Sequence, residues 1–257
     1  MTPQADADLR ERARRLGLCG LLATWELRSK QAWVREYLGV EEDERSRRSL
    51  ERRIRAARLG AFKAMADFDW DWPKSVDRDQ VEDLLQLGFL ADATNVVLLG
   101  PSGTGKTMIA QNLGYQALQH GHTVLRVTTS EMLNDLAAQD SSAALTRRLR
   151  RYCRPRLLIL DEVGYLSYDA RYGDLLFEVI SRRHQQRSTV LTTNRPFSEW
   201  TQVFAAAACV SALVDRIVHR VEIVQITGES YRQKDAMERA ERRVKERAEK
   251  AKKRRAS

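Results

Sequence analysis

The stretch that decides the fold runs from Asn95 to Thr107 and reads NVVLLGPSGTGKT. Its second half matches the phosphate-binding pattern G-x-x-x-x-G-K-[ST]. The loop consists of Gly100, Pro101, Ser102, Gly103, Thr104, Gly105, Lys106 and Thr107. Its glycines let the backbone approach an anion, and the exposed N–H groups can then hold phosphate oxygens at the start of a helix. We expect Lys106 to reach the β- and γ-phosphates and the Thr107 hydroxyl to be a ligand of Mg²⁺.

The surroundings of the loop favour a nucleotide site over a simple turn between a strand and a helix. Residues 96–99 form an apolar run typical of a buried strand, and residues 106–119 have the pattern of a helix. Farther along, apolar strand-like runs alternate with helical stretches, at 123–129, 156–160, 188–193 and 221–226. This alternation predicts an α/β domain with a parallel central sheet and helices on both faces, a three-layer sandwich.

A second motif, LLILDE at 157–162, is an apolar strand that ends in two acids. Asp161 at the strand tip would hold Mg²⁺, directly or through water, and Glu162 would orient and deprotonate an attacking water. The two acids could instead cap the next helix, but their position behind a buried strand downstream of the loop favours hydrolysis. Strand 188–193 is followed by Asn194, which could position the water or sense the γ-phosphate, or simply begin a turn.

The composition points to a polyanionic partner. The chain of 257 residues has a formal net charge of +9, which in a soluble protein favours nucleic acid but is also compatible with a merely basic protein. The helical stretch 142–154 concentrates this charge, and its candidate DNA contacts are Arg147, Arg148, Arg150 and Arg151. Like charges on one helical face repel, and a polyanion would relieve that repulsion. A solvated face with local counter-charges is the alternative.

The remaining segments predict one smaller domain, a linker and a tail. Residues 1–60 are expected to form a helical docking or assembly domain, with a break at Gly39 and Val40 before a second helix over 41–59. Residues 61–80 form a linker whose aromatic side chains pack on the core surface or cover an adenine ring. The ATPase domain is expected over 81–231. Residues 232–257 form a basic tail expected to be disordered alone.

The sequence favours a cytoplasmic protein without membrane contact. Its three cysteines are far apart, which does not suggest a disulfide framework. It has no apolar run of membrane-spanning length, and its N-terminus lacks the apolar core of a signal peptide.

Five segments in this order resemble the IstB-like transposition helper ATPases, AAA+ proteins of the DnaC/DnaA-like clade. They are GPSGTGKT, LLILDEVGYL, TTNRPFSEW, LVDRIVHR and GESYR. The resemblance implies an AAA+ P-loop fold, ATP and Mg²⁺ as cofactors, and a homo-oligomer that binds duplex DNA and recruits or stimulates a partner transposase. We expect this DNA binding to be largely independent of base sequence, because nothing in the chain resembles a recognition helix. The resemblance also implies that Arg216 is an arginine finger acting on a neighbouring subunit and that Arg232 is a second sensor. Arg195 and Arg220 are competitors for the finger. The sequence departs from the family at 205–208, where relatives usually have a more polar loop.

Three other functions stay open on the sequence alone. A DnaC-type replicative helicase loader shares the fold and would bind single-stranded DNA. A P-loop kinase for a small metabolite needs neither a glutamate beside the Mg²⁺-binding aspartate nor an arginine from a neighbour. A DNA-binding module could also use ATP only as an assembly switch, without hydrolysis.

Overall fold

The computed structural model describes residues 2–164, 170–204 and 208–256, with side chains through residue 243. The chain divides into two compact units, Met1–Arg55 and Ala56–Ser257. The loop at 205–208, where the sequence departs from the resembled family, lies largely outside the described residues. Among the described residues, no helix is long and apolar enough to cross a membrane.

The first unit is helical and has its own core. Its helices are α1 (Pro3–Arg15), α2 (Cys19–Ala23), α3 (Trp25–Arg28) and most of α4 (Ala32–Ala57). The core consists of Leu9, Ala13, Leu16, Trp25, Val34 and Leu38. The Trp25 indole N–H donates to Asp6 at 3.1 Å, which satisfies its polar atom at the edge of the core. The all-helical character expected of this region agrees with the structure.

Helix α4 runs without interruption through Gly39 and Val40, so the expected break there is wrong. A glycine inside a helix costs only about 1 kcal/mol relative to alanine. Val34 and Leu38, fully buried just before the glycine, hold this turn in the core. Beyond it, arginine–glutamate pairs one turn apart, such as Arg45 with Glu41 at 2.6 Å, support the charged half of the helix.

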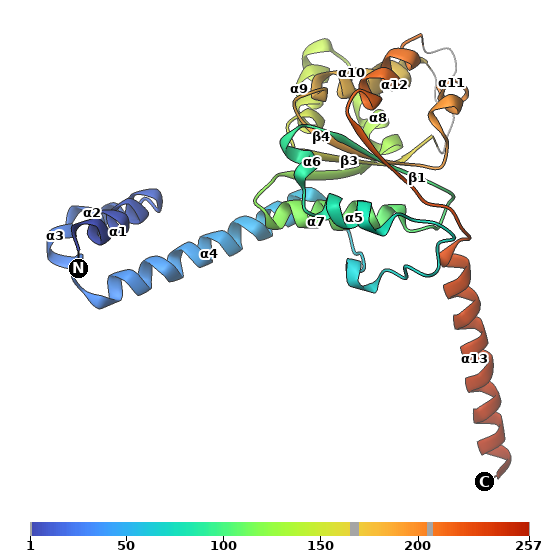
Figure 1. Ribbon diagram of the computed structural model, residues 1–257, viewed down its shortest axis with the longest axis horizontal. Coiled ribbons are helices and arrows are strands. Elements are labelled where there is room, and N and C mark those ends of the chain that lie inside the picture. The colour runs from blue at the N-terminus through green and yellow to red at the C-terminus, as the bar shows by residue number, and fades with distance from the viewer. Residues whose placement is uncertain (1, 165–169, 205–207, 257) are drawn as a thin grey trace. The chain divides into compact units, whose positions relative to one another are not determined.

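The second unit is built on a five-stranded parallel sheet in the order β2-β3-β4-β1-β5 (Figure 1). The strands are β1 (Asn95–Leu99), β2 (Val124–Thr128), β3 (Leu157–Val163), β4 (Ser188–Thr193) and β5 (Val221–Gln225). Because β1 lies between β4 and β5, and β4 next to β3, the loop after β1 is close to Asp161 near the end of β3 and to Asn194 just after β4. In parallel sheets, ligands bind at these carboxyl ends.

Helices cover both faces of the sheet, which confirms the predicted three-layer arrangement (Figure 1). One face carries α5 (Arg78–Leu85) and α7 (Lys106–Gln119). The other carries α8 (Thr129–Ala137), α9 (Ser142–Cys153), α10 (Ala170–Arg183) and α12 (Val210–Val218). Shorter helical segments are η1 (Met65–Asp67), α6 (Gly88–Ala91), η2 (Phe197–Glu199) and α11 (Trp200–Val203).

The C-terminal region differs from expectation, because Tyr231–Ala256 forms one helix, α13, instead of a disordered tail. The segment is rich in alanine, glutamate, lysine and arginine, which are strong helix formers. Pairs one turn apart, such as Arg239 with Asp235 at 2.8 Å, add to that preference. The first turn is held by the Tyr231 N–H, which donates to the Gly103 carbonyl at 3.0 Å. The helix therefore begins directly on the phosphate-binding loop.

Candidate functional site

At Gly103 and Gly105, the loop between β1 and α7 is packed so closely that a side chain larger than glycine does not fit. Gly103 and Gly105 have φ values of +83° and +96°, a region that favours glycine. A Cβ at Gly105 would lie 2.6 Å from Cε2 of Phe68, and one at Gly103 would collide with the Ser230 hydroxyl. Two segments distant in sequence, the linker and the residues before α13, therefore enclose the loop and leave its backbone for contact with a ligand.

Lys106 is buried at the first position of α7. Its ammonium donates to the Gly100 and Pro101 carbonyls at 2.7 and 2.6 Å. Burial lowers the pKa of Lys106 to about 8, and the Arg232 guanidinium adds to the shift while the Asp161 carboxylate opposes it. A desolvated ammonium that donates to two neutral carbonyls gains from a new anionic partner. The site is thus suited to polyphosphate.

The Asp161 carboxylate is the best-anchored acid in the site. It is buried, and its Oδ1 accepts hydrogen bonds from the hydroxyls of Thr107 at 3.1 Å and Thr192 at 2.5 Å. Its Oδ2 pairs with the Arg126 guanidinium at 2.5 Å. Thr192 and Arg126 were not anticipated from the sequence. The only signal for Arg126 was a charged residue inside an otherwise apolar strand.

The Thr107–Asp161 contact brings two hard oxygen ligands together, as a Mg²⁺ site requires. Mg²⁺ is usually held by one or two carboxylates together with waters and substrate phosphates. In the described part of the chain, no three His, Cys, Asp or Glu side chains gather into a metal cluster. The two oxygens therefore fit a metal that arrives with a nucleotide and is completed by its phosphates.

We expect Arg126→Gln to destabilise the ligand-free protein by about 3 kcal/mol, because it leaves the buried Asp161 carboxylate without its ion-pair partner. Urea unfolding would measure the loss. The matched control is Arg78→Gln, since Arg78 pairs with Glu82 on an exposed helix face at 2.6 Å and such pairs contribute little. Addition of ATP and Mg²⁺ should recover more stability in Arg126→Gln than in the control. An equal loss in both variants would contradict the assigned role of Arg126.

Glu162 sits in a backbone conformation that few glutamates adopt. Its φ is +62°, and the pairing of β3 with β4 shifts register between Leu160 and Val163. The Glu162 N–H donates to the Thr192 hydroxyl at 2.9 Å, which holds the irregular turn. Bulges of this kind re-aim side chains beside functional sites. The result is an exposed carboxylate next to the buried Asp161, as a general base for water requires.

Asn194 and Arg232 lie near the loop on two other segments of the chain. Asn194 is exposed directly after β4, the strand between β1 and β3, and the Gly100 N–H donates to the carbonyl of neighbouring Thr193 at 3.1 Å. Arg232 follows Tyr231 in the first turn of α13 and lines the same cavity as Thr104. Both predicted positions are thus close to the loop.

Arg216 has a different environment. It lies on α12, its guanidinium hydrogen-bonds the Ser181 hydroxyl, and it stacks over the Phe177 ring at 4.3 Å. Both partners are on α10, so within the described part of the chain Arg216 contacts this helix and not the loop. Its competitors also have local partners, because Arg195 pairs with Glu199 at 3.2 Å and Arg220 donates to the Asp92 carbonyl at 3.1 Å.

Aromatic residues of the linker form part of a cavity of about 310 Å³ beside the loop. Trp72 donates to the Glu229 carbonyl at 3.1 Å and meets the Tyr231 ring edge-on. The lining also includes Phe62, Phe68, Pro73, Thr104, Thr107, Met108, Tyr231 and Arg232. The volume of this cavity is at the lower end of the range for small-molecule pockets. The linker thus packs on the domain surface, as expected, and also borders a cavity that reaches Thr104 and Thr107 of the loop.

The arginines of α9 are not equivalent. Arg148 makes a bidentate pair with Asp135, which also accepts the Tyr152 hydroxyl. Its guanidinium is therefore engaged inside the molecule, which weakens its assignment as a DNA contact. Arg147 and Arg150 are exposed, and Arg151 lies 5.7 Å from the centre of the Tyr152 ring. These three remain the candidates for binding an anion.

Comparison with known proteins gives consistent matches. The family model described as IstB-like ATP binding protein matches residues 16–239. An ATP-binding protein of insertion sequence IS232 from Bacillus thuringiensis subsp. berliner is 37% identical, over 69% of this chain and 72% of its own length. The corresponding IS21 protein of Pseudomonas aeruginosa is 36% identical, over 74% and 72%. An insertion-sequence ATP-binding protein of Mycobacterium tuberculosis is 33% identical, over 88% and 94%.

Solved structures agree on the fold. DnaI superimposes with a TM-score of 0.55 at 18% identity, covering 66% of this chain and 92% of that one. The DnaC helicase loader superimposes with a TM-score of 0.50 at 18% identity, covering 68% and 99%.

Proposed function

The chain belongs to the IstB-like ATP-binding protein family, and from this premise we propose that it is an ATPase that assembles on duplex DNA and recruits or stimulates a partner transposase. The observation that supports hydrolysis best is the pairing of Thr107 with buried Asp161, at 3.1 Å, beside an exposed Glu162. A site that only held a nucleotide would need no strained glutamate next to its metal ligand.

Each residue then has a role in phosphoryl transfer to water. The loop amides and Lys106 hold the phosphates, and Thr107 and Asp161 would hold Mg²⁺, which would supply positive charge beside the phosphates. Glu162 accepts a proton from the water whose oxygen attacks the γ-phosphorus, while the bond to the β–γ bridging oxygen breaks. Asn194 orients that water, and Arg232 contacts the γ-phosphate.

Arg216 completes the site from a neighbouring copy of the chain. A cation placed at the γ-phosphate stabilises the charge that spreads over its oxygens in the transition state. Since the partners of Arg216 within its own chain are Ser181 and Phe177, the guanidinium is held in place without taking part in its own subunit's loop. Hydrolysis should then depend on the assembly of several copies of the chain, and ATP would control how these copies assemble on DNA.

Charge reversal of Arg147, Arg150 and Arg151 to Glu should weaken binding to duplex DNA and reduce its salt dependence. Each lost phosphate contact lowers the slope of log affinity against log salt by about 0.9, so the triple variant should lose about 3. Fluorescence anisotropy with a labelled duplex at several salt concentrations measures both quantities. A single-stranded oligonucleotide run in parallel tests the helicase-loader alternative, which requires preference for single strands.

The matched control reverses three exposed arginines that pair on their own helices, Arg14, Arg78 and Arg182. It changes net charge by the same amount. If the control lost as much affinity and slope as the α9 variant, binding would reflect overall charge and α9 would not be the DNA surface.

A further inference from the structure

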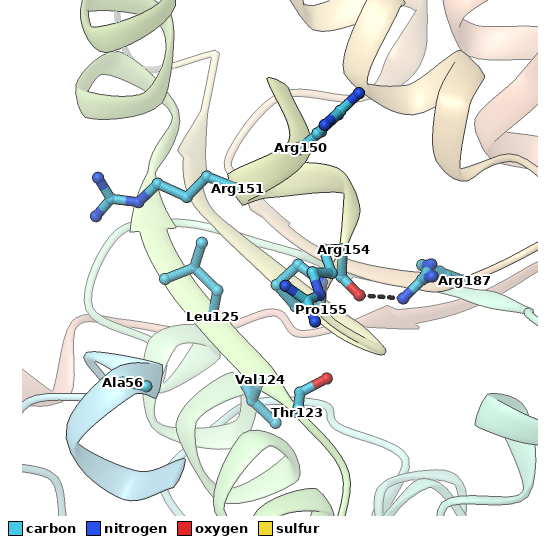
Figure 2. Close-up of a pocket in the computed structure, with 9 residues that line it drawn as sticks. All are labelled: Ala56, Thr123, Val124, Leu125, Arg150, Arg151, Arg154, Pro155 and Arg187. Carbon is cyan, nitrogen blue, oxygen red and sulfur yellow. Dashed lines mark hydrogen bonds between the residues drawn. The ribbon is translucent and has the colours of Figure 1, made fainter. Parts of the chain in front are cut away.

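A second concave site lies at the end of the sheet opposite to the nucleotide loop. Its volume is about 630 Å³, and Figure 2 shows it at the C-terminal turn of α9. Its lining includes the start of β2 at Thr123, Val124 and Leu125, Pro155 before β3, and Arg187 before β4. These are the amino ends of the strands, whereas the phosphate loop follows the carboxyl end of β1. The two sites can therefore be occupied at the same time.

The charge in this pocket has one sign. Its lining residues are Ala56, Thr123, Val124, Leu125, Arg150, Arg151, Arg154, Pro155 and Arg187, with no carboxylate among them. In Figure 2 the Arg150 and Arg151 side chains diverge to opposite sides, while Arg154 and Arg187 lie beside Pro155. Four guanidinium groups around one hollow repel one another, and a ligand with several negative charges would relieve that repulsion.

The end of α9 would ordinarily oppose an anion, because the last carbonyls of a helix carry partial negative charge. In this protein, arginine side chains donate hydrogen bonds to those carbonyls. The buried Arg183 donates from Nη1 to the carbonyls of Tyr152, Cys153 and Pro155 at 3.1, 3.3 and 2.9 Å. Arg187 donates to the Arg154 carbonyl, the bond drawn in Figure 2. The negative end of the helix is thus covered by cations.

The same bonds fix the pocket in shape. Arg183 also donates from Nε to the Thr189 hydroxyl at 3.0 Å and from Nη2 to the Ser188 carbonyl, so it ties the end of α9 to β4. Arg154 and Arg187 stand on the two segments that this tie joins. A site whose cations are positioned before binding loses less entropy when the ligand arrives.

We propose that this pocket binds phosphate groups of the DNA backbone, with Arg154 and Arg187 as contacts beyond the exposed face of α9. The proposal rests on the proposed function and extends the DNA surface from one helix to a concave site shared with the start of β4. Arg187, distant from α9 in sequence, is the residue that the helical pattern could not reveal. The shared chemistry is the phosphate group, which free polyphosphate also carries.

The test compares Arg154→Gln/Arg187→Gln with the control Arg78→Gln/Arg182→Gln in the full chain, with a non-hydrolysable ATP analogue filling the nucleotide site. Duplex binding by anisotropy at about 0.15 M salt should weaken at least tenfold in the pocket variant, and its salt slope should fall by about 2. Arg154→Lys/Arg187→Lys, which keeps the charge, should retain most of the affinity and serves if the glutamine variant does not fold. Calorimetry with inorganic tripolyphosphate forms the second arm.

Each outcome has one meaning. Loss of duplex binding in the pocket variant alone supports the proposal. Loss of tripolyphosphate binding with duplex binding unchanged would overturn DNA as the ligand and assign the pocket to a free polyphosphate. The pocket proposal fails, and the proposed function stands, if the pocket variant binds duplex and tripolyphosphate as tightly as its control while the α9 variant binds duplex more weakly. If the unaltered chain binds no duplex at all, the proposed function fails and with it the DNA assignment of the pocket.

Discussion

Glu162→Gln should lower the rate of ATP hydrolysis at least about a hundredfold, which is the effect expected from removal of a general base. Glutamine has the same size but cannot accept a proton from water. The side chain is exposed and the irregular backbone at φ +62° is held by the Glu162 N–H to Thr192, a bond that the substitution keeps. Affinity for ATP and thermal stability should therefore change little.

Phosphate release under saturating ATP measures the rate, and a fluorescent ATP analogue measures affinity. Glu222→Gln is the control, because Glu222 is an exposed glutamate on β5 that accepts a hydrogen bond from Gln80, away from the loop. An unchanged rate of hydrolysis in Glu162→Gln would show that Glu162 is not the general base. If, in addition, DNA binding and assembly were unchanged, ATP would act as a switch without turnover.

Arg216→Ala should have an effect of similar or larger size, because an arginine supplied to the γ-phosphate by a second molecule contributes about 10³ to 10⁵ in rate. The losses within its own chain are one hydrogen bond to Ser181 and the stacking on Phe177, so the protein should stay folded and bind ATP normally. Steady-state hydrolysis in the presence of duplex DNA measures the loss.

Arg220→Ala is the control for this substitution, because Arg220 is the other arginine of the LVDRIVHR segment and donates to the Asp92 carbonyl. A larger loss of hydrolysis in Arg220→Ala than in Arg216→Ala would mean that Arg220, and not Arg216, acts on the γ-phosphate of the neighbouring copy. Thermal melting of both variants separates an effect on rate from an effect on folding.

Much of the site was predictable because each motif is contiguous. The loop from Gly100 to Thr107 and the pair Asp161–Glu162 combine strand, turn and function in a few neighbouring residues, and alternation of strands with helices indicates a parallel sheet. Parallel pairing then brings the ends of β1, β3 and β4 together. That is why Asn194 could be assigned to the nucleotide site from the sequence.

The remainder depended on contacts between distant segments. Arg126 and Thr192 meet Asp161 only because β2 and β4 flank β3 in a particular register, which no local pattern specifies. The engagement of Arg148 by Asp135 likewise depends on how α8 packs on α9. At Gly39, burial of Val34 and Leu38 outweighed the low helix propensity of glycine.

The central claim is that one hydrolytic site is completed by a second copy of the chain. Mixing Glu162→Gln with Arg216→Ala protein tests it most directly, because each variant supplies the group that the other lacks. With DNA present and random assembly at equal amounts, about a quarter of the junctions would pair an intact Glu162 with an intact Arg216. We predict that two nearly inactive proteins regain about that share of normal hydrolysis when mixed. If the mixture hydrolyses ATP no faster than its components, the claim that two copies of the chain share one site would be wrong.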